Sequence, residues 1–173
     1  MDAAAHYRHL LQLGRVEFLA TVAPAVLVRY RAEETELDAG GLGTVTLTLD
    51  EETVAEEVLP EAKLATAAVD FELYPLSKKP GASFPDRITI GRTPNNDVAI
   101  REHSVSRLHA YVRTDGDSWL IADAGSKNGS TLQGEVLEPR REKPLPSRAI
   151  LRLGDVELTF FLATDLFTAL GGS

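Results

Sequence analysis

Three polar clusters stand close together in the second half of the sequence, at residues 91–97, 104–109 and 125–130. Each combines glycine or small polar residues with a Lys or Arg, and short apolar runs separate the clusters. Loops of this composition can surround an anion with backbone N–H groups and a few cations. The clusters therefore predict a site for a negatively charged ligand, formed by loops at one end of a β-structure.

The candidate ligand contacts are three cations, a serine and an asparagine. Arg92 follows a predicted strand, where its planar guanidinium can bind phosphate through two parallel hydrogen bonds. The hydroxyl of Ser106 can donate to a phosphate oxygen, and Arg107 and Lys127 add positive charge. Asn128 carries a donor and an acceptor on one amide, so it can hold the main chain of an extended peptide.

The composition is typical of a soluble globular protein, since 43% of the 173 residues are hydrophobic and 25% are charged. There is no cysteine, which excludes disulfides, thiolate metal sites and thiol catalysis. No segment reaches the roughly 18 apolar residues of a membrane helix, so no membrane contact is expected. The N-terminus lacks the charged start and apolar run of a signal peptide, and we expect a cytoplasmic protein.

The net charge of −8 is unevenly distributed. Residues 1–68 carry 5 Lys and Arg against 12 acids, a net charge of −7, whereas residues 69–173 carry 13 against 14, a net charge of −1. Nucleic-acid binding relies on a basic face, so this distribution argues against nucleic-acid partners. An anion bound by the second half must be held by a few local cations.

Residues 1–66 are predicted to form a small acidic α/β extension. They contain no group of residues typical of a catalytic site. Leu and Ala dominate its start, and the break at Gly14 separates two helical patterns. Helices are expected at 3–13, 16–22 and 51–59, and strands at 25–30 and 44–49. The sequence leaves open whether this extension packs on the rest of the chain.

Residues 67–173 predict a β-sandwich domain, because many short strands follow one another with turn signals between them. Strands are expected at 68–74, 87–91, 97–100, 110–114, 118–123, 130–132, 149–153 and 156–163. The charged, proline-rich residues 138–146 are expected to form a mobile loop, and residues 164–170 a short C-terminal helical turn. The fold class is therefore mainly β.

The three clusters, taken together, resemble the forkhead-associated (FHA) domain. The resemblance rests on Gly91-Arg92, on Ser-Arg-Leu-His at 106–109 and on Ser-Lys-Asn-Gly-Ser at 126–130. It extends over about residues 67–163 and includes Asn96-Asp97 and the turn at 151–155. It implies an antiparallel β-sandwich of about eleven strands whose loops bind phosphothreonine peptides.

The resemblance also implies roles for individual residues. It assigns ligand contacts to five residues, namely Arg92, Ser106, Arg107, Lys127 and Asn128. It assigns structural support of the binding loops to three others, namely Gly91, His109 and Gly129. Ser130 and Gln133 depart from the usual family residues, threonine and asparagine, and affect the expected ligand side-chain preference more than phosphate binding.

The resemblance thus implies a phosphothreonine-dependent interaction module, an adaptor or effector in Ser/Thr kinase signalling that is not an enzyme and needs no cofactor. Its partner would be a phosphothreonine protein, such as a Ser/Thr kinase or its substrate. The alternative is a scaffold or assembly protein that uses the same sandwich without phosphate. The identity of the partner, the residue preferred after the phosphothreonine and the oligomeric state stay open.

The sequence disfavours three other chemistries. His109 with Ser104 or Ser106 and Asp123 has the residue types of a nucleophilic triad, but no nucleophile elbow is present. Three aspartates, Asp115, Asp117 and Asp123, lack the spacing of a calcium loop. His6 and His9 lack a third metal ligand, so no metal site is expected.

One threonine of the acidic extension is a candidate phosphorylation site. Thr35 lies in Ala-Glu-Glu-Thr-Glu-Leu-Asp at 32–38, with Asp38 three positions after it. FHA domains often prefer particular residues at that position. The hypothesis is that phosphorylated Thr35 binds the pocket of the same or another copy, and the alternative is a solvated acidic loop.

Overall fold

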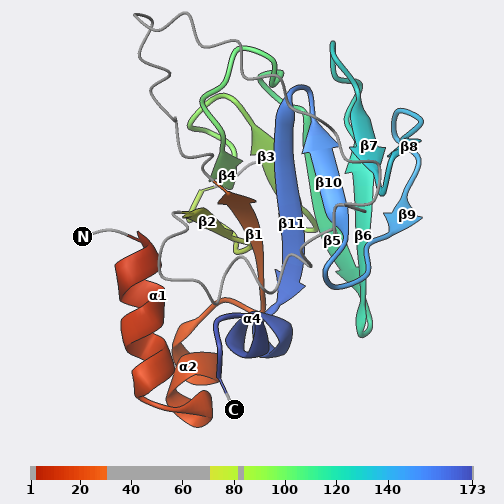
Figure 1. Ribbon diagram of the computed structural model, residues 1–173. Helices are drawn as coiled ribbons and strands as arrows, with labels where there is room; N and C mark the ends of the chain where they lie inside the picture. Colours follow the sequence, from red (N-terminus) through yellow and green to blue (C-terminus); the bar gives the residue numbers. More distant parts are fainter. Residues whose placement is uncertain (1–2, 31–70, 82–83, 173) are drawn as a thin grey trace, which may run out of the picture.

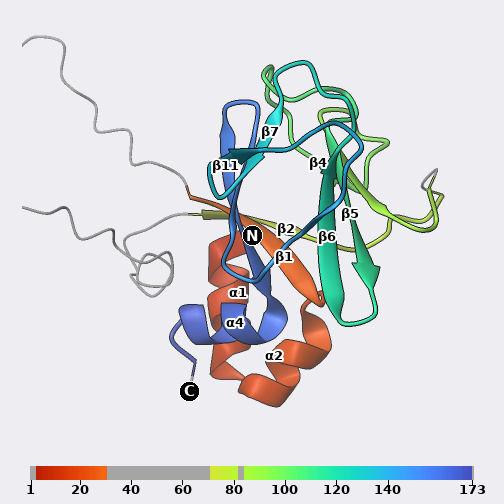
Figure 2. The same ribbon diagram turned by 90° about the vertical axis from the view of Figure 1, so that its right-hand side faces the viewer.

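The computed structural model describes residues 3–30, 71–81 and 84–172, and its elements are labelled in Figure 1. Two β-sheets pack face to face, and the three short helices of the described residues lie at one end (Figures 1 and 2). The prediction of a mainly β sandwich of eleven strands, with N-terminal helices and a C-terminal helix, is confirmed. The predicted strand 44–49, helix 51–59 and Thr35 lie outside the described residues.

The larger sheet has six strands in the order β2-β1-β11-β10-β7-β8. Its strands are β1 (Ala25–Tyr30), β2 (Phe71–Pro75), β7 (Ser130–Leu132), β8 (Glu135–Val136), β10 (Ile150–Leu153) and β11 (Val156–Leu162). The smaller sheet has the order β4-β3-β5-β6-β9. Its strands are β3 (Ile88–Gly91), β4 (Val98–Ala99), β5 (Ala110–Asp115), β6 (Ser118–Asp123) and β9 (Lys143–Pro144). Strands β3 and β4 pair in parallel, so the smaller sheet is mixed.

Strand β1 is the first strand of the sandwich, and its sequence begins with a continuous apolar run, with no alternation of apolar and polar residues. Ala25 and Leu27 belong to the core between the two sheets, whereas Val26 and Val28 face the helices on the other side. All four side chains are fully buried, because both faces of this strand are covered. The helices are α1 (Ala3–Gln12), α2 (Arg15–Thr21) and α4 (Ala163–Ala169).

The larger sheet crosses the predicted domain boundary at residue 67. Strand β1 comes from the predicted extension, yet it lies between β2 and β11 and pairs with both. Phe18 of α2 is also fully buried, with its ring 5.3 Å from that of Phe167 in α4. The described part of the extension therefore packs on the sandwich and supplies one of its strands.

Residues 138–146 are more ordered than the expectation of a mobile loop allowed. They contain β9, which pairs with β6, and the side chain of Leu145 is buried. A two-residue strand is too short to show alternation in the sequence. Pro144 argues further against a strand, because proline is rare within sheets. Proline is nevertheless accepted here because β9 is an edge strand.

None of the helices in the described residues is long and apolar enough to cross a membrane.

Candidate functional site

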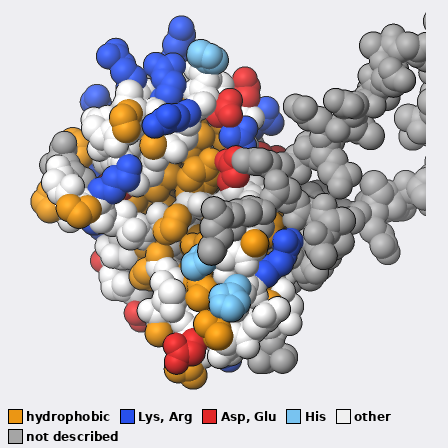
Figure 3. Space-filling model, turned by 90° about the vertical axis from the view of Figure 1, so that its left-hand side faces the viewer, with side chains coloured by type: hydrophobic (Ala, Val, Ile, Leu, Met, Phe, Trp, Pro, Cys, Tyr) orange, Lys and Arg blue, Asp and Glu red, His pale blue; other side chains and the backbone are white. Residues whose placement is uncertain are grey.

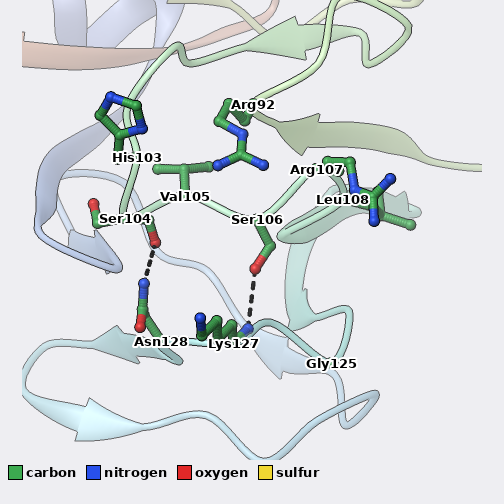
Figure 4. A pocket seen from close by; sticks show the side chains of 10 residues that line it. All are labelled: Arg92, His103, Ser104, Val105, Ser106, Arg107, Leu108, Gly125, Lys127 and Asn128. Carbon is green, nitrogen blue, oxygen red and sulfur yellow. Dashed lines mark hydrogen bonds between the residues drawn. The ribbon is translucent and has the colours of Figure 1, made fainter.

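The loops at the end of the sandwich opposite the helices surround an open cleft of about 510 Å³ (Figure 4). The cleft is built from the connections β3–β4, β4–β5 and β6–β7, which correspond to the three polar clusters. It is lined by Arg92, His103, Ser104, Val105, Ser106, Arg107, Leu108, Gly125, Lys127 and Asn128. The fold thus brings all five predicted ligand contacts to one cleft.

Three cations of the cleft have no acidic neighbour among the described residues. Arg92, Arg107 and Lys127 form no ion pair in that part of the chain. Elsewhere the arginines are often paired, as Arg29 is with Glu102 at 3.0 Å. Lys and Arg side chains also gather at the loop end of the face shown in Figure 3. The cleft therefore concentrates positive charge that the described fold does not neutralise.

Ser106 is held so that its hydroxyl hydrogen stays available. Its Oγ accepts a hydrogen bond from the backbone N–H of Lys127 at 3.0 Å, as Figure 4 shows. Its backbone carbonyl accepts from the N–H of Arg92 at 2.9 Å. Because a hydroxyl can accept and donate at once, Ser106 links the three loops and can still donate to an anion in the cleft.

His109 braces two of the loops from beneath and is fully buried. Its Nδ1 accepts a hydrogen bond from the N–H of Ser106 at 3.0 Å, so the proton lies on Nε2. That Nε2–H donates to the carbonyl of Gly129 at 2.9 Å. Burial lowers the pKa of His109, which keeps the ring neutral in this arrangement.

The contacts of His109 do not assemble a catalytic triad. Both ring nitrogens are engaged by main-chain groups, and Oδ2 of Asp123 lies 4.0 Å from Nε2. Among the described residues, no serine hydroxyl hydrogen-bonds to the ring. A triad requires nucleophile, base and carboxylate to be linked by hydrogen bonds, whereas the described hydrogen bonds of the His109 ring join two loops.

Asp123 organises the third loop and was not predicted to do so. Its Oδ1 accepts from the N–H groups of Gly125 and Ser126 at 2.8 Å, and its Oδ2 accepts from the hydroxyls of Ser126 and Ser130 at 2.5 Å. Burial alone would raise the pKa of Asp123, but these hydrogen bonds outweigh burial and lower it. The signal in the sequence is an aspartate at a strand end followed by Gly and Ser, which is typical of a side-chain-capped turn.

Gly91 allows two loops to approach each other closely. A Cβ at this position would lie 2.1 Å from the carbonyl oxygen of Arg107 and 2.7 Å from Nδ2 of Asn96. That Nδ2 donates to the same carbonyl at 2.6 Å. Gly91 and Asn96 therefore fix the main chain of Arg107 beside the cleft.

Asn128 is attached to the second loop. Its Nδ2 donates to the carbonyl of Ser104 at 2.8 Å, while the Oγ of Ser104 accepts from the N–H of Asp155 at 3.0 Å. A Cβ on Gly154 would lie 2.3 Å from the Ser104 carbonyl, so this turn also needs glycine. The sequence suggests Ser104 only as a nucleophile, whereas in the structure its carbonyl holds the side chain of Asn128.

Two residues that depart from the usual family residues lie outside the cleft lining. Ser130 is buried against Asp123, and the side-chain Oε1 of Gln133 accepts from the N–H of Ile150 at 3.1 Å. Gly129, between the cleft and Ser130, has a φ of 80°, which favours glycine. All three residues thus shape the loop end from outside the cleft.

Comparison with known proteins places the loops and the strands that carry them in one family. Residues 88–154 match the family model of the FHA domain. An FHA domain-containing protein of Arabidopsis thaliana is 30% identical over 99 residues, which are 57% of this chain and 25% of that protein. The oxoglutarate dehydrogenase inhibitor of Corynebacterium jeikeium is 33% identical over 70 residues, which are 40% of this chain and 46% of that protein.

Among solved structures, Mycobacterium tuberculosis EmbR in complex with a low affinity phosphopeptide is similar with a TM-score of 0.45 and 30% identity. This similarity covers 53% of this chain and 22% of that chain. The present chain spans a quarter to about half of the length of the two curated relatives. The match shows that residues 88–154 carry an FHA domain, as the resemblance in the sequence predicted.

Proposed function

We propose that this chain is a phosphothreonine-dependent protein interaction module that binds a phosphorylated segment of a partner in the loop-end cleft. The observation that carries the proposal is the convergence of Arg92, Arg107 and Lys127 on one cleft without ion pairs among the described residues. A dianionic phosphate supplies the missing negative charge and several acceptor oxygens.

The phosphate is held by charge-assisted hydrogen bonds. The guanidinium of Arg92 donates two parallel bonds, and the hydroxyl hydrogen of Ser106 donates a third. Arg107 and Lys127 add charge at the exposed rim. The loops are fixed in advance by the hydrogen bonds of Ser106, His109 and Asp123, so binding costs less conformational entropy.

Asn128 holds the ligand main chain. Its Nδ2 is already used by Ser104, and its Oδ1 accepts no hydrogen bond from the described residues. That oxygen accepts from a backbone N–H of the ligand, while the second Nδ2 hydrogen donates to a ligand carbonyl. Such contacts orient an extended peptide without selecting a particular side chain.

The partner is a protein phosphorylated by a Ser/Thr kinase, and the chain acts as an adaptor or regulated effector, in the cytoplasm and without catalysis. The Corynebacterium relative is named as an inhibitor of an enzyme, which supports a regulatory role. The triad geometry around His109 is absent from the described residues, which supports a non-catalytic role.

The test is a titration of the full chain with phosphothreonine peptides and their unphosphorylated counterparts, followed by fluorescence anisotropy. Only the phosphorylated forms should bind, and Arg92→Ala should weaken binding by roughly 30- to 100-fold at an unchanged melting temperature. Arg141→Ala is the matched control, because Arg141 is exposed, pairs with Glu138 and lies outside the cleft lining. Equal binding of both peptide forms would favour the phosphate-independent scaffold.

A further inference from the structure

A second groove, of about 270 Å³, lies on the smaller sheet and adjoins the loop-end cleft. Phe84 and Arg87 precede β3, Tyr111 lies in β5, and Leu108 and Arg140 come from loops. Tyr111 precedes the core residue Val112, so its side chain leaves the sheet on the side away from the core. We call this surface the Phe84 groove.

The Phe84 groove exposes apolar side chains. Phe84 is 42% exposed and Leu108 is 40% exposed, whereas most large hydrophobic residues of the described chain are buried. Phe84 and Leu108 thus place two exposed large apolar side chains on the same groove. Such a surface is typical of a contact for another molecule.

Arg87 forms a fixed wall of the groove. Its guanidinium lies over the ring of Tyr111 at 4.4 Å and near the ring of Phe84 at 5.6 Å. Its Nη2 also pairs with Asp86 at 3.0 Å. The charge of Arg87 is therefore already matched, and its flat face extends the apolar surface.

Arg140 supplies the charge that is not matched. It has no ion pair among the described residues, and its backbone φ is 63°, in the left-handed region. Its N–H donates to the carbonyl of Asp123 at 2.7 Å, which holds this conformation. Backbone strain of this kind is maintained only where the surroundings enforce it. The groove thus combines an apolar floor with one available guanidinium.

Leu108 makes the Phe84 groove continuous with the loop-end cleft, because Leu108 lines both. It lies at the opposite end of the cleft from His103 in Figure 4. Ser106 and Leu108 are two positions apart, so their Cα atoms are separated by at most roughly 7 Å. A peptide bound at Ser106 therefore reaches the groove with a residue about two to four positions from its phosphothreonine.

We propose that the phosphorylated partner also places a large apolar side chain, with a carboxylate next to it, in the Phe84 groove. The apolar side chain packs on Phe84, Leu108 and the stacked Arg87–Tyr111 pair, and the carboxylate pairs with Arg140. This proposal rests on the proposed function and adds a determinant of which phosphothreonine segment is bound.

The experiment uses the full chain and phosphothreonine peptides with alanine flanks. A leucine is placed in turn at each of the four positions before and after the phosphothreonine, and affinities are measured by calorimetry. One position on one side should raise affinity by about tenfold, since a leucine side chain becomes largely buried there. At the neighbouring position, glutamate should then bind tighter than glutamine.

Two variants test the location. Phe84→Ala should abolish the gain from leucine while the alanine-flanked phosphopeptide binds as before, and Arg140→Gln should remove the preference for glutamate. Val136→Ala, at an exposed residue outside both surfaces, is the control and should change neither.

Three results would overturn the proposal: no leucine position raises affinity, the gain survives Phe84→Ala, or glutamate and glutamine bind equally. If no phosphorylated peptide binds at all, the proposed function itself has failed, and the two failures are thereby distinguished.

Discussion

His109 holds two loops in place only while its ring is neutral. Burial lowers its pKa in the folded chain, so the unfolded chain takes up a proton first as the pH falls. The stabilisation is complete above the unfolded pKa of about 6.5 and is lost as the pH decreases below that value. The described histidines other than His109 are exposed.

We therefore expect the free energy of unfolding, measured by urea denaturation, to decrease from pH 7.5 to pH 5.5. His109→Gln should be less stable at pH 7.5, by about 2 kcal/mol, because two buried main-chain groups lose their partner. Its stability should change less between the two pH values. An equal pH dependence in both proteins would contradict the role of His109.

A single methyl group at Gly91 should disturb the cleft. Its Cβ would meet the Arg107 carbonyl at 2.1 Å, so Gly91→Ala should cost about 3 kcal/mol and weaken phosphopeptide binding. Gly116→Ala is the control: its φ of 61° is unfavourable for alanine, but no atom lies within 4 Å of the added Cβ, so the change should cost only about 1 kcal/mol. Thermal melting and peptide titration of both variants check this, and equal behaviour would refute it.

At the scale of elements, the helical layer is a part of the fold that the binding site does not touch. Phe18 is fully buried and packs on Phe167, so Phe18→Ala should cost about 3–5 kcal/mol. Val16→Ala, on the same helix at a side chain that is 80% exposed, should change stability by less than about 0.5 kcal/mol. Denaturation should show this difference, while both folded variants bind phosphopeptide like the parent chain.

The longer strands could be predicted from the sequence because apolar runs and alternation mark them. The order of the strands could not, since the pairing of β1 with β11 joins residues from opposite ends of the chain. The two-residue strands β8 and β9 carry no pattern of their own and depend on their neighbours. The sequence shows a change of composition near residue 67, but it does not show that β1, which comes before this point, pairs with β2 and β11.

For the whole molecule, charge is divided between an acidic chain and a cationic cleft. The net charge is −8, yet three cations meet at the cleft without ion pairs among the described residues. Salt should screen their attraction for a phosphate, so affinity should decrease roughly tenfold between 0.05 and 0.5 M NaCl. Arg92→Ala should show a weaker salt dependence, and an affinity unaffected by salt would contradict electrostatic binding.

The residues that line the cleft could be predicted from the sequence more fully than the residues that hold its loops in place. The sequence predicted Arg92, Ser106, Arg107, Lys127 and Asn128, because cations and small polar residues in loops mark a binding surface, and the fold brings them together. Ser104, Asp123 and the Phe84 groove were missed. Their roles arise from distances between loops and from side-chain exposure, which spacing along the chain does not reveal.

The pairing of Tyr30 with Phe71 has a practical consequence. Tyr30 ends β1 and Phe71 begins β2, so the two residues are neighbours in space although residues 31–70 separate them along the chain. The neighbouring Arg29 pairs with Glu102 at 3.0 Å, and Glu102 precedes His103 of the cleft lining, so this end of β1 and β2 lies beside the cleft. A fluorescent label placed at this end of the two strands is therefore expected to respond to phosphopeptide binding.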